Sequence, residues 1–292
     1  AVDVLVLEVG MGGRLDAVNA FDADCAIVTS IGLDHMDYLG ATLEAIGHEK
    51  AGIFRAGKPA VLADPAPPAS VLAQARAIGA SLLRIGQEFG FDTDFGQWSF
   101  WGPAGRKSDL PYPALHGRIQ LQNASAALAA LEALRERLPV SERALRRGLA
   151  EVKLLGRFQL LPGHPALVLD VGHNPQAAAV LAQNLSDLGP CSGTSAVFGM
   201  LRDKDIGGVV KLLAPQIDRW FVCTLPPPRG AQASELAQAL RQAGVDAVRE
   251  FENPAKAYAA ACSGAAENDR IIVFGSFHTV ADVLAARETP KA

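Results

Sequence analysis

Nothing in the sequence directs the protein to a membrane or out of the cell. No apolar run approaches the roughly 20 residues that a membrane-spanning helix needs. The chain opens with Ala1-Val2-Asp3-Val4-Leu5, which lacks the basic start and the cleavage site of a signal peptide. The four cysteines lie far apart and form no CxxC pair, which argues against a zinc site or a disulfide framework. We therefore expect a cytoplasmic protein with free thiols.

Several catalytic signatures are also missing. The sequence has no Ser-His-Asp order, no HExxH zinc motif and no EF-hand loop. It has no GxxGK(S/T) phosphate loop, the usual cradle for the phosphates of ATP. The formal net charge of −4 gives no reason to expect nucleic acid or a membrane as a partner. With 49% hydrophobic and 20% charged residues, the composition is that of a globular protein that buries a core.

The length and the pattern of apolar runs predict two α/β domains. A domain has roughly 150 residues, so a chain of 292 residues suggests two. After Gly156-Arg157, strands and helices alternate regularly, which predicts a doubly wound α/β domain. We expect its strands at 166–170, 196–199, 219–224 and 270–275, and its helices at 176–188, 206–215, 234–243, 254–266 and 279–287.

The first part of the chain is less regular. The β-branched apolar run Val2–Val9 predicts a buried strand of a parallel sheet, and further strands are expected at 25–31 and 59–62. The remaining expectations are helices over 42–54, 122–138 and 141–152, the last with Ser141 as N-cap, and either hairpins or an irregular connection over 87–114. We place the domain boundary near 153–158, which gives domains 1–155 and 156–292.

A carboxylate and a glycine-rich turn follow the first expected strand, in the segment Glu8-Val9-Gly10-Met11-Gly12-Gly13-Arg14-Leu15-Asp16-Ala17-Val18-Asn19. Open α/β sheets bind ligands at the carboxyl ends of their strands, and glycine lets the backbone approach a bound group closely. The segment is not a dinucleotide fingerprint, because Leu15 occupies the place of the third glycine. The alternative is a tight turn with a solvated Glu8.

Ionisable side chains also follow the second expected strand. Asp34, His35 and Asp37 lie there, and carboxylate and imidazole groups at two strand ends favour a metal–phosphate site. A single histidine is more often a hydrogen-bonded structural residue. Lys50, near the end of the helix over 42–54, either interacts with the helix dipole or lies partly buried beside metal and phosphate. In the second case desolvation would lower its pKa and free the amine to form a carbamate.

The second domain has similar strand ends. The segment Asp170-Val171-Gly172-His173-Asn174-Pro175 ends a strand and opens a helix, so Asp170 and His173 are expected to face the crevice above the sheet. Asn174 as a helix cap is the simpler interpretation of that residue. Gly275–Thr279 ends the last strand, and its Ser276 either caps a helix or binds an anion.

Taken together, these segments resemble the folate branch of the Mur ligases, the dihydrofolate synthase/folylpolyglutamate synthase family. The segments that carry the resemblance span almost the whole chain: LEVGMGGRLDAVN, TSIGLDHMDYLG, HEKAGIFR, LGRFQ, LDVGHNP, GMLRDKDI, PPPRGA and GSFHTVADV. The first of them argues against the peptidoglycan Mur ligases, whose equivalent usually reads differently. One small departure is Gly172, which replaces the alanine of the family's DxAHNP pattern.

The resemblance implies a fold and an activity. The fold is the C-terminal part of a P-loop-type central ATPase domain, followed by a Rossmann-like α/β domain that closes over it. The activity is ATP-dependent addition of L-glutamate to dihydropteroate or to a reduced folate by a monomer. Its metal is Mg²⁺, and a monovalent cation is a further candidate ligand. The family's GTNGKGS-type phosphate loop lies upstream of the segment where this chain begins, so we expect the 292 residues alone to be inactive.

The resemblance also assigns roles to individual residues. It implies that the metal ligands are Glu8, His35 and a carbamylated Lys50, and that the catalytic residues are Lys50 and His173. The pterin pocket contains Leu15, Asp16 and Ala17, and Ser276 and His278 lie near the incoming glutamate. The ATP contacts are Asn123, Arg157 and Asp170, with Asn174 in the same loop as Asp170. Taken alone, Arg157 is more simply a surface residue. Two other functions stay open: a Mur-type ligase with a different acceptor, and a catalytically silent fragment or binding module.

Overall fold

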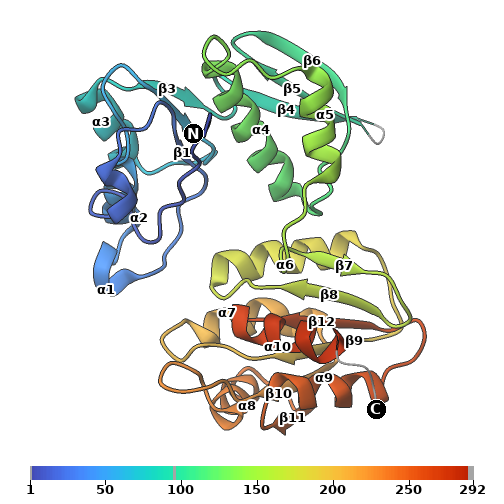
Figure 1. Cartoon of the computed structure of the whole chain (residues 1–292). Coiled ribbons are helices and arrows are strands. Elements are labelled where there is room, and N and C mark those ends of the chain that lie inside the picture. Colours follow the sequence, from blue (N-terminus) through green and yellow to red (C-terminus); the bar gives the residue numbers. More distant parts are fainter. Residues whose placement is uncertain (1, 95–96, 289–292) are drawn as a thin grey trace. The chain divides into compact units, whose positions relative to one another are not determined.

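The computed structural model describes residues 2–94 and 97–288, which form two compact units (Figure 1). Unit 1 comprises residues 1–114 and 118–152, and unit 2 comprises residues 115–117 and 153–292. The border after Val152 lies close to the expected boundary near 153–158, and the division into 1–155 and 156–292 stays a prediction.

Unit 1 is built on a short parallel sheet with the strand order β1-β2-β3. Its elements are η1 (Ala17–Ala20), β1 (Ala26–Val28), α1 (Met36–Leu39), α2 (Leu43–Ala51), β2 (Pro59–Leu62), α3 (Ala69–Ile78) and β3 (Ser81–Arg84). The central strand β2 alternates as the strand period of two requires: Ala60 and Leu62 pack with α2 and α3, whereas Val61 belongs to the core on the other face. This sheet is therefore covered on both faces, as parallel sheets usually are.

The second core of unit 1 lies between helix α4 (Arg118–Ala133) and an antiparallel sheet. The sheet contains β4 (Gly90–Asp94), β5 (Gln97–Gly102) and β6 (Gly105–Leu110), so hairpins, the first of the two alternatives for 87–114, are what this segment forms. Trp98 and Phe100 of β5 are fully buried against Leu128 of α4. Helix α5 (Glu142–Glu151) begins as predicted, because the Ser141 side chain accepts a hydrogen bond from the backbone N–H of Ala144.

The prediction of a buried strand at 2–9 is wrong. No strand of the described chain pairs with these residues, and Val4, Leu5 and Val6 are 48%, 64% and 89% exposed. A β-branched apolar run indicates that a segment suits a strand, but the strand forms only where a neighbour satisfies its backbone N–H and C=O groups. The second predicted strand is confirmed but is shorter than expected, since β1 covers Ala26–Val28 instead of 25–31.

Unit 2 is a doubly wound domain with the strand order β11-β10-β9-β12-β8-β7 (Figure 1). The predicted strands are confirmed to within two residues as β8 (Ala166–Asp170), β9 (Thr194–Phe198), β10 (Arg219–Cys223) and β12 (Arg270–Phe274), all parallel to their neighbours in this set. Two edge strands were not foreseen, β7 (Gln159–Leu161) and β11 (Val248–Phe251). Both are short, and β11 carries Arg249 and Glu250, charges that are typical of exposed edges.

Helices cover both faces of this sheet. The helices are α6 (Pro175–Asp187), α7 (Ile206–Leu213), α8 (Ala233–Gln242), α9 (Pro254–Ser263) and α10 (Phe277–Glu288), with a short 3-10 turn η2 (Ala214–Gln216). One core packs α6, α7 and α8 against Phe198, Trp220 and Phe274, and the other packs α9 and α10 against the opposite face. Among the described residues, no helix combines the length and the apolar character needed to cross a bilayer.

Candidate functional site

The two strand-end segments of unit 1 lie at one edge of its sheet. Strands β1 and β2 are parallel neighbours, with Val28 paired to Leu62, so the residues that follow both strands leave the sheet at the same edge. A hydrogen bond from the backbone N–H of Ile31 to the carboxylate of Asp64 (2.9 Å) joins the two segments. The side chains after β1 are therefore held at an edge where α/β sheets bind ligands.

Asp34 and His35 lie together at this edge, and the charge of Asp34 acts on Lys50. His35 has a left-handed backbone (φ 51°), its N–H donates to Oδ1 of Asp34 (2.8 Å), and its Nε2 lies 4.0 Å from the same oxygen. Burial lowers the pKa of the Lys50 amine, and the charge of Asp34 partly offsets that shift. Asp34 thus interacts with both residues, although the sequence reasoning gave it no role of its own. Its place beside His35 in the sequence was the available signal.

The fit of this group to a hard divalent cation is partial. Asp34 and His35 supply an oxygen and a nitrogen donor, and a carbamate on Lys50 would add two oxygens. Glu8 lies on the exposed segment before the glycine-rich turn. Within residues 2–94 and 97–288, no three His, Cys, Asp or Glu side chains gather closely enough to hold a metal ion. The metal roles of Glu8, His35 and Lys50 therefore stay predictions.

The glycine-rich segment, residues 10–20, is tied together by Asp16. Its Oδ2 accepts from the backbone N–H of Met11 (2.9 Å) and its Oδ1 from that of Val18 (3.1 Å), which makes Asp16 the N-cap of η1. The hydrogen bond from Met11, followed by that from Val18, holds the pKa of Asp16 below its usual range. Leu15 is 79% exposed and Ala17 is also exposed. Asp16 thus shapes the turn, while the residues on either side of it face outward.

Asn123 lies on α4, near the same edge of the sheet. The neighbouring Gln122 donates from Nε2 to the backbone carbonyl of Ala63, the residue after β2 (2.5 Å). Asn123 itself is half-buried and donates to the side chain of Gln120 (3.2 Å). The start of α4 is therefore attached to the strand end, which is where a residue that contacts a nucleotide would be placed.

In unit 2 the carboxylate of Asp170 joins two turns. It accepts from the backbone N–H of Phe158 (3.0 Å) and from that of Gly172 (2.6 Å). Burial raises the pKa of Asp170, although these two N–H groups and the nearby Arg157 and His173 oppose the shift. Gly156 has φ +68°, and a side chain there would meet Val171 at 2.7 Å. The Gly156–Phe158 turn is thus held closely against the end of β8.

The ends of β8 and β12 lie next to each other, because Asp170 pairs with Phe274 in the parallel sheet. The hydroxyl of Ser276 accepts from the backbone N–H of His278 (3.2 Å), and Ser276 is only 4% exposed. The exposed Phe277 between them lies under the guanidinium of Arg157, with 5.7 Å from the carbon to the ring centroid. Sequence reasoning missed Phe277, because only the fold brings it to Arg157.

The neighbouring residues after β8 have clear structural partners. Asn174 caps α6 as the simpler interpretation predicted, because its side chain accepts from the N–H of Ala177 (2.8 Å). Nδ1 of His173 lies 3.0 Å from the carbonyl oxygen of Val171. This contact orients the imidazole ring, with Nε2 on its opposite side.

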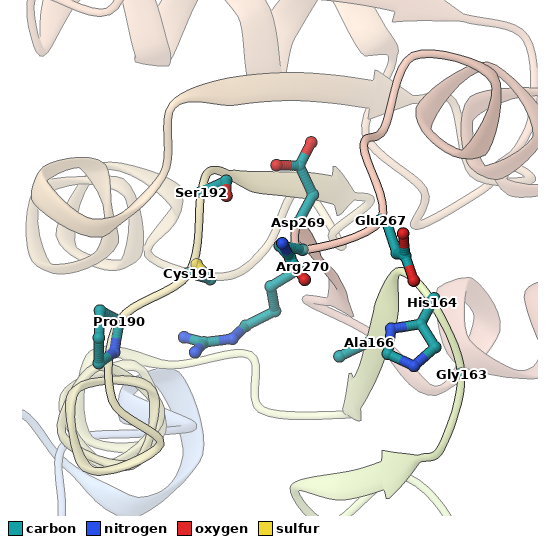
Figure 2. Close-up of a pocket in the computed structure, with 10 residues that line it drawn as sticks. Gly163, His164, Ala166, Pro190, Cys191, Ser192, Glu267, Asp269 and Arg270 are labelled. Carbon is teal, nitrogen blue, oxygen red and sulfur yellow. The ribbon is translucent and has the colours of Figure 1, made fainter.

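A cavity of about 450 Å³ lies at the other edge of the same sheet, where β8 and β12 begin (Figure 2). It is lined by Ala166 and Arg270 and by the loops around Cys191 and Glu267. The Arg270 guanidinium donates to the carbonyls of Leu185 (3.1 Å) and Gly189 (2.9 Å), and so secures the end of α6. None of the candidate residues lines this cavity. We therefore place the candidate site at the carboxyl ends of the strands instead.

Comparisons with known proteins match both parts of the chain. Residues 1–131 match the Mur ligase middle domain, and residues 156–277 match the glutamate ligase domain of the Mur ligases. The matches agree with the expected fold class in both parts. The candidate residues of unit 1 fall in the first matched region, and those of unit 2 fall in the second except His278, which directly follows it.

Individual relatives extend these matches. The chain is 44% identical over 283 residues to a dihydrofolate synthase/folylpolyglutamate synthase of Escherichia coli. That match covers 97% of this chain and 64% of the relative. It is 38% identical to the enzyme of that name from Haemophilus influenzae, with 98% and 69% covered. A solved bifunctional folylpolyglutamate synthase/dihydrofolate synthase with Mn, AMPPNP and L-glutamate bound superposes with a TM-score of 0.87 at 42% identity, covering 96% of this chain and 66% of that one. The chain thus spans a little under two thirds of the E. coli relative.

Proposed function

The chain belongs to the dihydrofolate synthase/folylpolyglutamate synthase family of Mur ligases, and on that basis we propose that the product of its full reading frame functions as an ATP-dependent glutamate ligase. The acceptor is the carboxylate of dihydropteroate or the γ-carboxylate of a folate. The names of the relatives include both reactions. The solved relative with Mn, AMPPNP and L-glutamate supports a divalent cation, ATP and glutamate as the other ligands.

The reaction has two steps. A carboxylate oxygen of the acceptor attacks the γ-phosphorus of ATP, the bond to the leaving oxygen of ADP breaks, and an acyl phosphate forms. The amino nitrogen of glutamate then attacks the acyl carbon, and the tetrahedral intermediate expels phosphate as the amine loses its proton. Both steps gather negative charge on oxygen atoms, so groups that neutralise or orient those oxygens accelerate them.

The strand ends of unit 1 would serve the phosphate and the acceptor. A divalent cation, when bound, neutralises the oxygens that crowd together in the first step. The residues proposed to hold it are Glu8, His35 and a carbamylated Lys50. Asp34 lies beside His35. The exposed Leu15 and Ala17 would contact the pterin, on a turn that Asp16 holds in shape.

The strand ends of unit 2 would serve the nucleotide and the glutamate. Asp170 and Arg157 are the nucleotide contacts proposed in this unit, and Asn123 is the one proposed in unit 1. His173, held by its Nδ1 contact to the backbone, would present Nε2 to the reacting groups. Ser276 and His278 would bind the incoming glutamate.

The observation that supports Lys50 in its proposed role is its burial, which lowers the pKa of the amine, together with the effect of the Asp34 charge on that amine and the 4.0 Å from Oδ1 of Asp34 to Nε2 of His35. We test it with Lys50→Ala in the product of the full reading frame that encodes this chain, with Lys58→Ala as the control. Lys58 is 45% exposed and bridges Asp24. Lys50→Ala should lose most ligase activity and regain part of it with small carboxylic acids in solution, whereas Lys58→Ala should stay active. Unchanged activity in Lys50→Ala would remove Lys50 from the mechanism.

Two further measurements address the alternatives. Acceptor profiling with dihydropteroate, tetrahydrofolate and UDP-sugar peptides distinguishes the folate ligase from a Mur-type ligase with a different acceptor. We also propose that the 292 residues alone hydrolyse no ATP and bind it weakly, because they contain no GxxGK(S/T) loop. Calorimetric titration of this polypeptide that gave tight Mg-ATP binding would contradict that part of the proposal.

A further inference from the structure

The glycine-rich segment lies in direct backbone contact with the end of α2, which carries Lys50. The N–H of Arg14 donates to the carbonyl of Glu49 (2.8 Å). A side chain at Gly13 would meet the carbonyl oxygens of Glu49 and Lys50 at 2.8 and 2.9 Å, and one at Gly52 would meet Cβ of Arg14 at 2.4 Å. This close approach sets the distance between the outward-facing residues of the segment and Lys50.

The guanidinium of Arg55 secures the contact with all five of its N–H donors. Nε donates to Asp22 (2.5 Å), and one terminal nitrogen donates to the carbonyls of Gly52 (3.4 Å) and Phe54 (3.1 Å). The other terminal nitrogen donates to the carbonyl (2.8 Å) and to the side-chain oxygen (2.9 Å) of Asn19. A guanidinium is planar and has five donors, so a lysine cannot reproduce this set.

The carboxamide of Asn19 connects the glycine-rich segment to Gly52 at the end of α2. Its Nδ2 donates to the carbonyls of Arg14 (3.0 Å) and Gly52 (3.2 Å), while its oxygen accepts from Arg55. The ion pair of Arg14 with Glu49 also spans the contact, but the Arg14 side chain is 46% exposed, and exposed pairs contribute little. We call the side chains of Arg55 and Asn19 the Arg55–Asn19 clamp.

We propose that the Arg55–Asn19 clamp is the positioning device of the acceptor site, which fixes Leu15–Ala17 relative to Lys50. The inference rests on the proposed function. Asp16 keeps the turn in shape through bonds within the segment, so the turn is a small rigid body. Its placement on α2 depends on the clamp. Weakening the clamp therefore displaces the acceptor contacts without unfolding the turn.

The test uses two conservative variants and a matched control. Arg55→Lys keeps the charge and loses the five-donor geometry. Asn19→Asp is isosteric, and it turns an oxygen instead of Nδ2 towards the carbonyls of Arg14 and Gly52. Arg137→Lys is the control, because Arg137 pairs only at the surface with Asp24 and its side chain is 68% exposed.

Residue-resolved hydrogen exchange on the 292-residue chain tests, without any substrate, whether the Arg55–Asn19 clamp holds the glycine-rich segment against α2. In both clamp variants the N–H of Arg14 should exchange at least about tenfold faster, because its bond to Glu49 opens more often. The N–H groups of Met11 and Val18 should keep their protection, because Asp16 still holds them. Unchanged exchange at Arg14 overturns the clamp, and equal loss of protection at all three sites overturns the rigid-turn argument.

Steady-state kinetics of the full reading-frame product then tests whether the clamp positions the acceptor contacts. Arg55→Lys and Asn19→Asp should raise KM for the pteridine acceptor about tenfold, with kcat and the KM values for ATP and glutamate within about twofold. Arg137→Lys should match the wild type. An unchanged acceptor KM, or equal changes in all three KM values, overturns the positioning role. A wild-type product that is inactive with every acceptor refutes the proposed function instead, and exchange at Arg14 still decides whether the clamp exists.

Discussion

Removing the carboxylate of Asp170 should destabilise unit 2 by an amount that follows from its two hydrogen bonds. Asp170→Ala leaves the backbone N–H groups of Phe158 and Gly172, both on buried residues, without their acceptor. An unsatisfied buried donor costs about 1–3 kcal/mol, so we expect a loss of about 2–6 kcal/mol. Asp170→Asn keeps one acceptor oxygen and should lose roughly half as much.

This loss is measured in unit 2 alone by a urea titration in which hydrogen exchange of peptides from β8, β9 and β12 detects the unfolding. A small domain has a denaturant slope of about 1–3 kcal/mol per molar urea, so a loss of about 2 kcal/mol lowers the midpoint by roughly 1 M. The exposed Asp246 provides the control variant Asp246→Ala. If Asp170→Ala lowered the midpoint no more than Asp246→Ala does, the two hydrogen bonds would not secure the turn.

The pH dependence gives an independent check on Asp170. Burial raises its folded-state pKa above the ordinary value of 3.8, so the folded protein binds this proton more tightly than the unfolded chain does. The resulting stability is fully present below the unfolded pKa and is lost as pH rises through the folded pKa. Asp170→Asn cannot titrate and should lack this acid-side component. An identical pH profile in the variant and the wild type would contradict the inferred shift.

Two further predictions concern unit 1. Burial lowers the folded-state pKa of Lys50, so unit 1 should gain stability as pH rises from that pKa to the ordinary value of 10.5. Lys50→Met should remove this gain and Lys58→Met should not, as urea titrations at pH 7 and pH 10 would reveal. Gly52→Ala should lower the free energy of unfolding by about 1–3 kcal/mol, because its Cβ would lie 2.4 Å from Cβ of Arg14. Gly148→Ala, in α5 with open space around it, should instead raise it by about 0.5–1 kcal/mol, and equal effects of the two alanines would contradict the close contact at Gly52.

Local patterns in the sequence were sufficient for most of unit 2. The strand Ala166–Asp170 and the helices that follow each strand were placed to within a few residues, because regular alternation of apolar runs and helical periods leaves few other folds. The caps Ser141 and Asn174 were also correct, since a capping side chain bonds to a backbone only three residues away. Interactions of this short range are encoded where they occur.

Contacts between distant residues required the folded chain. The run at 2–9 has strand composition, but whether a neighbouring strand lies beside it is not a local property, and that prediction failed. The same limit applied to the effect of the Asp34 charge on Lys50, to Phe277 under Arg157, and to the five donors of Arg55, since each depends on backbone paths that packing brings together. Residue type shows what a side chain can donate or accept, and the fold selects its partner.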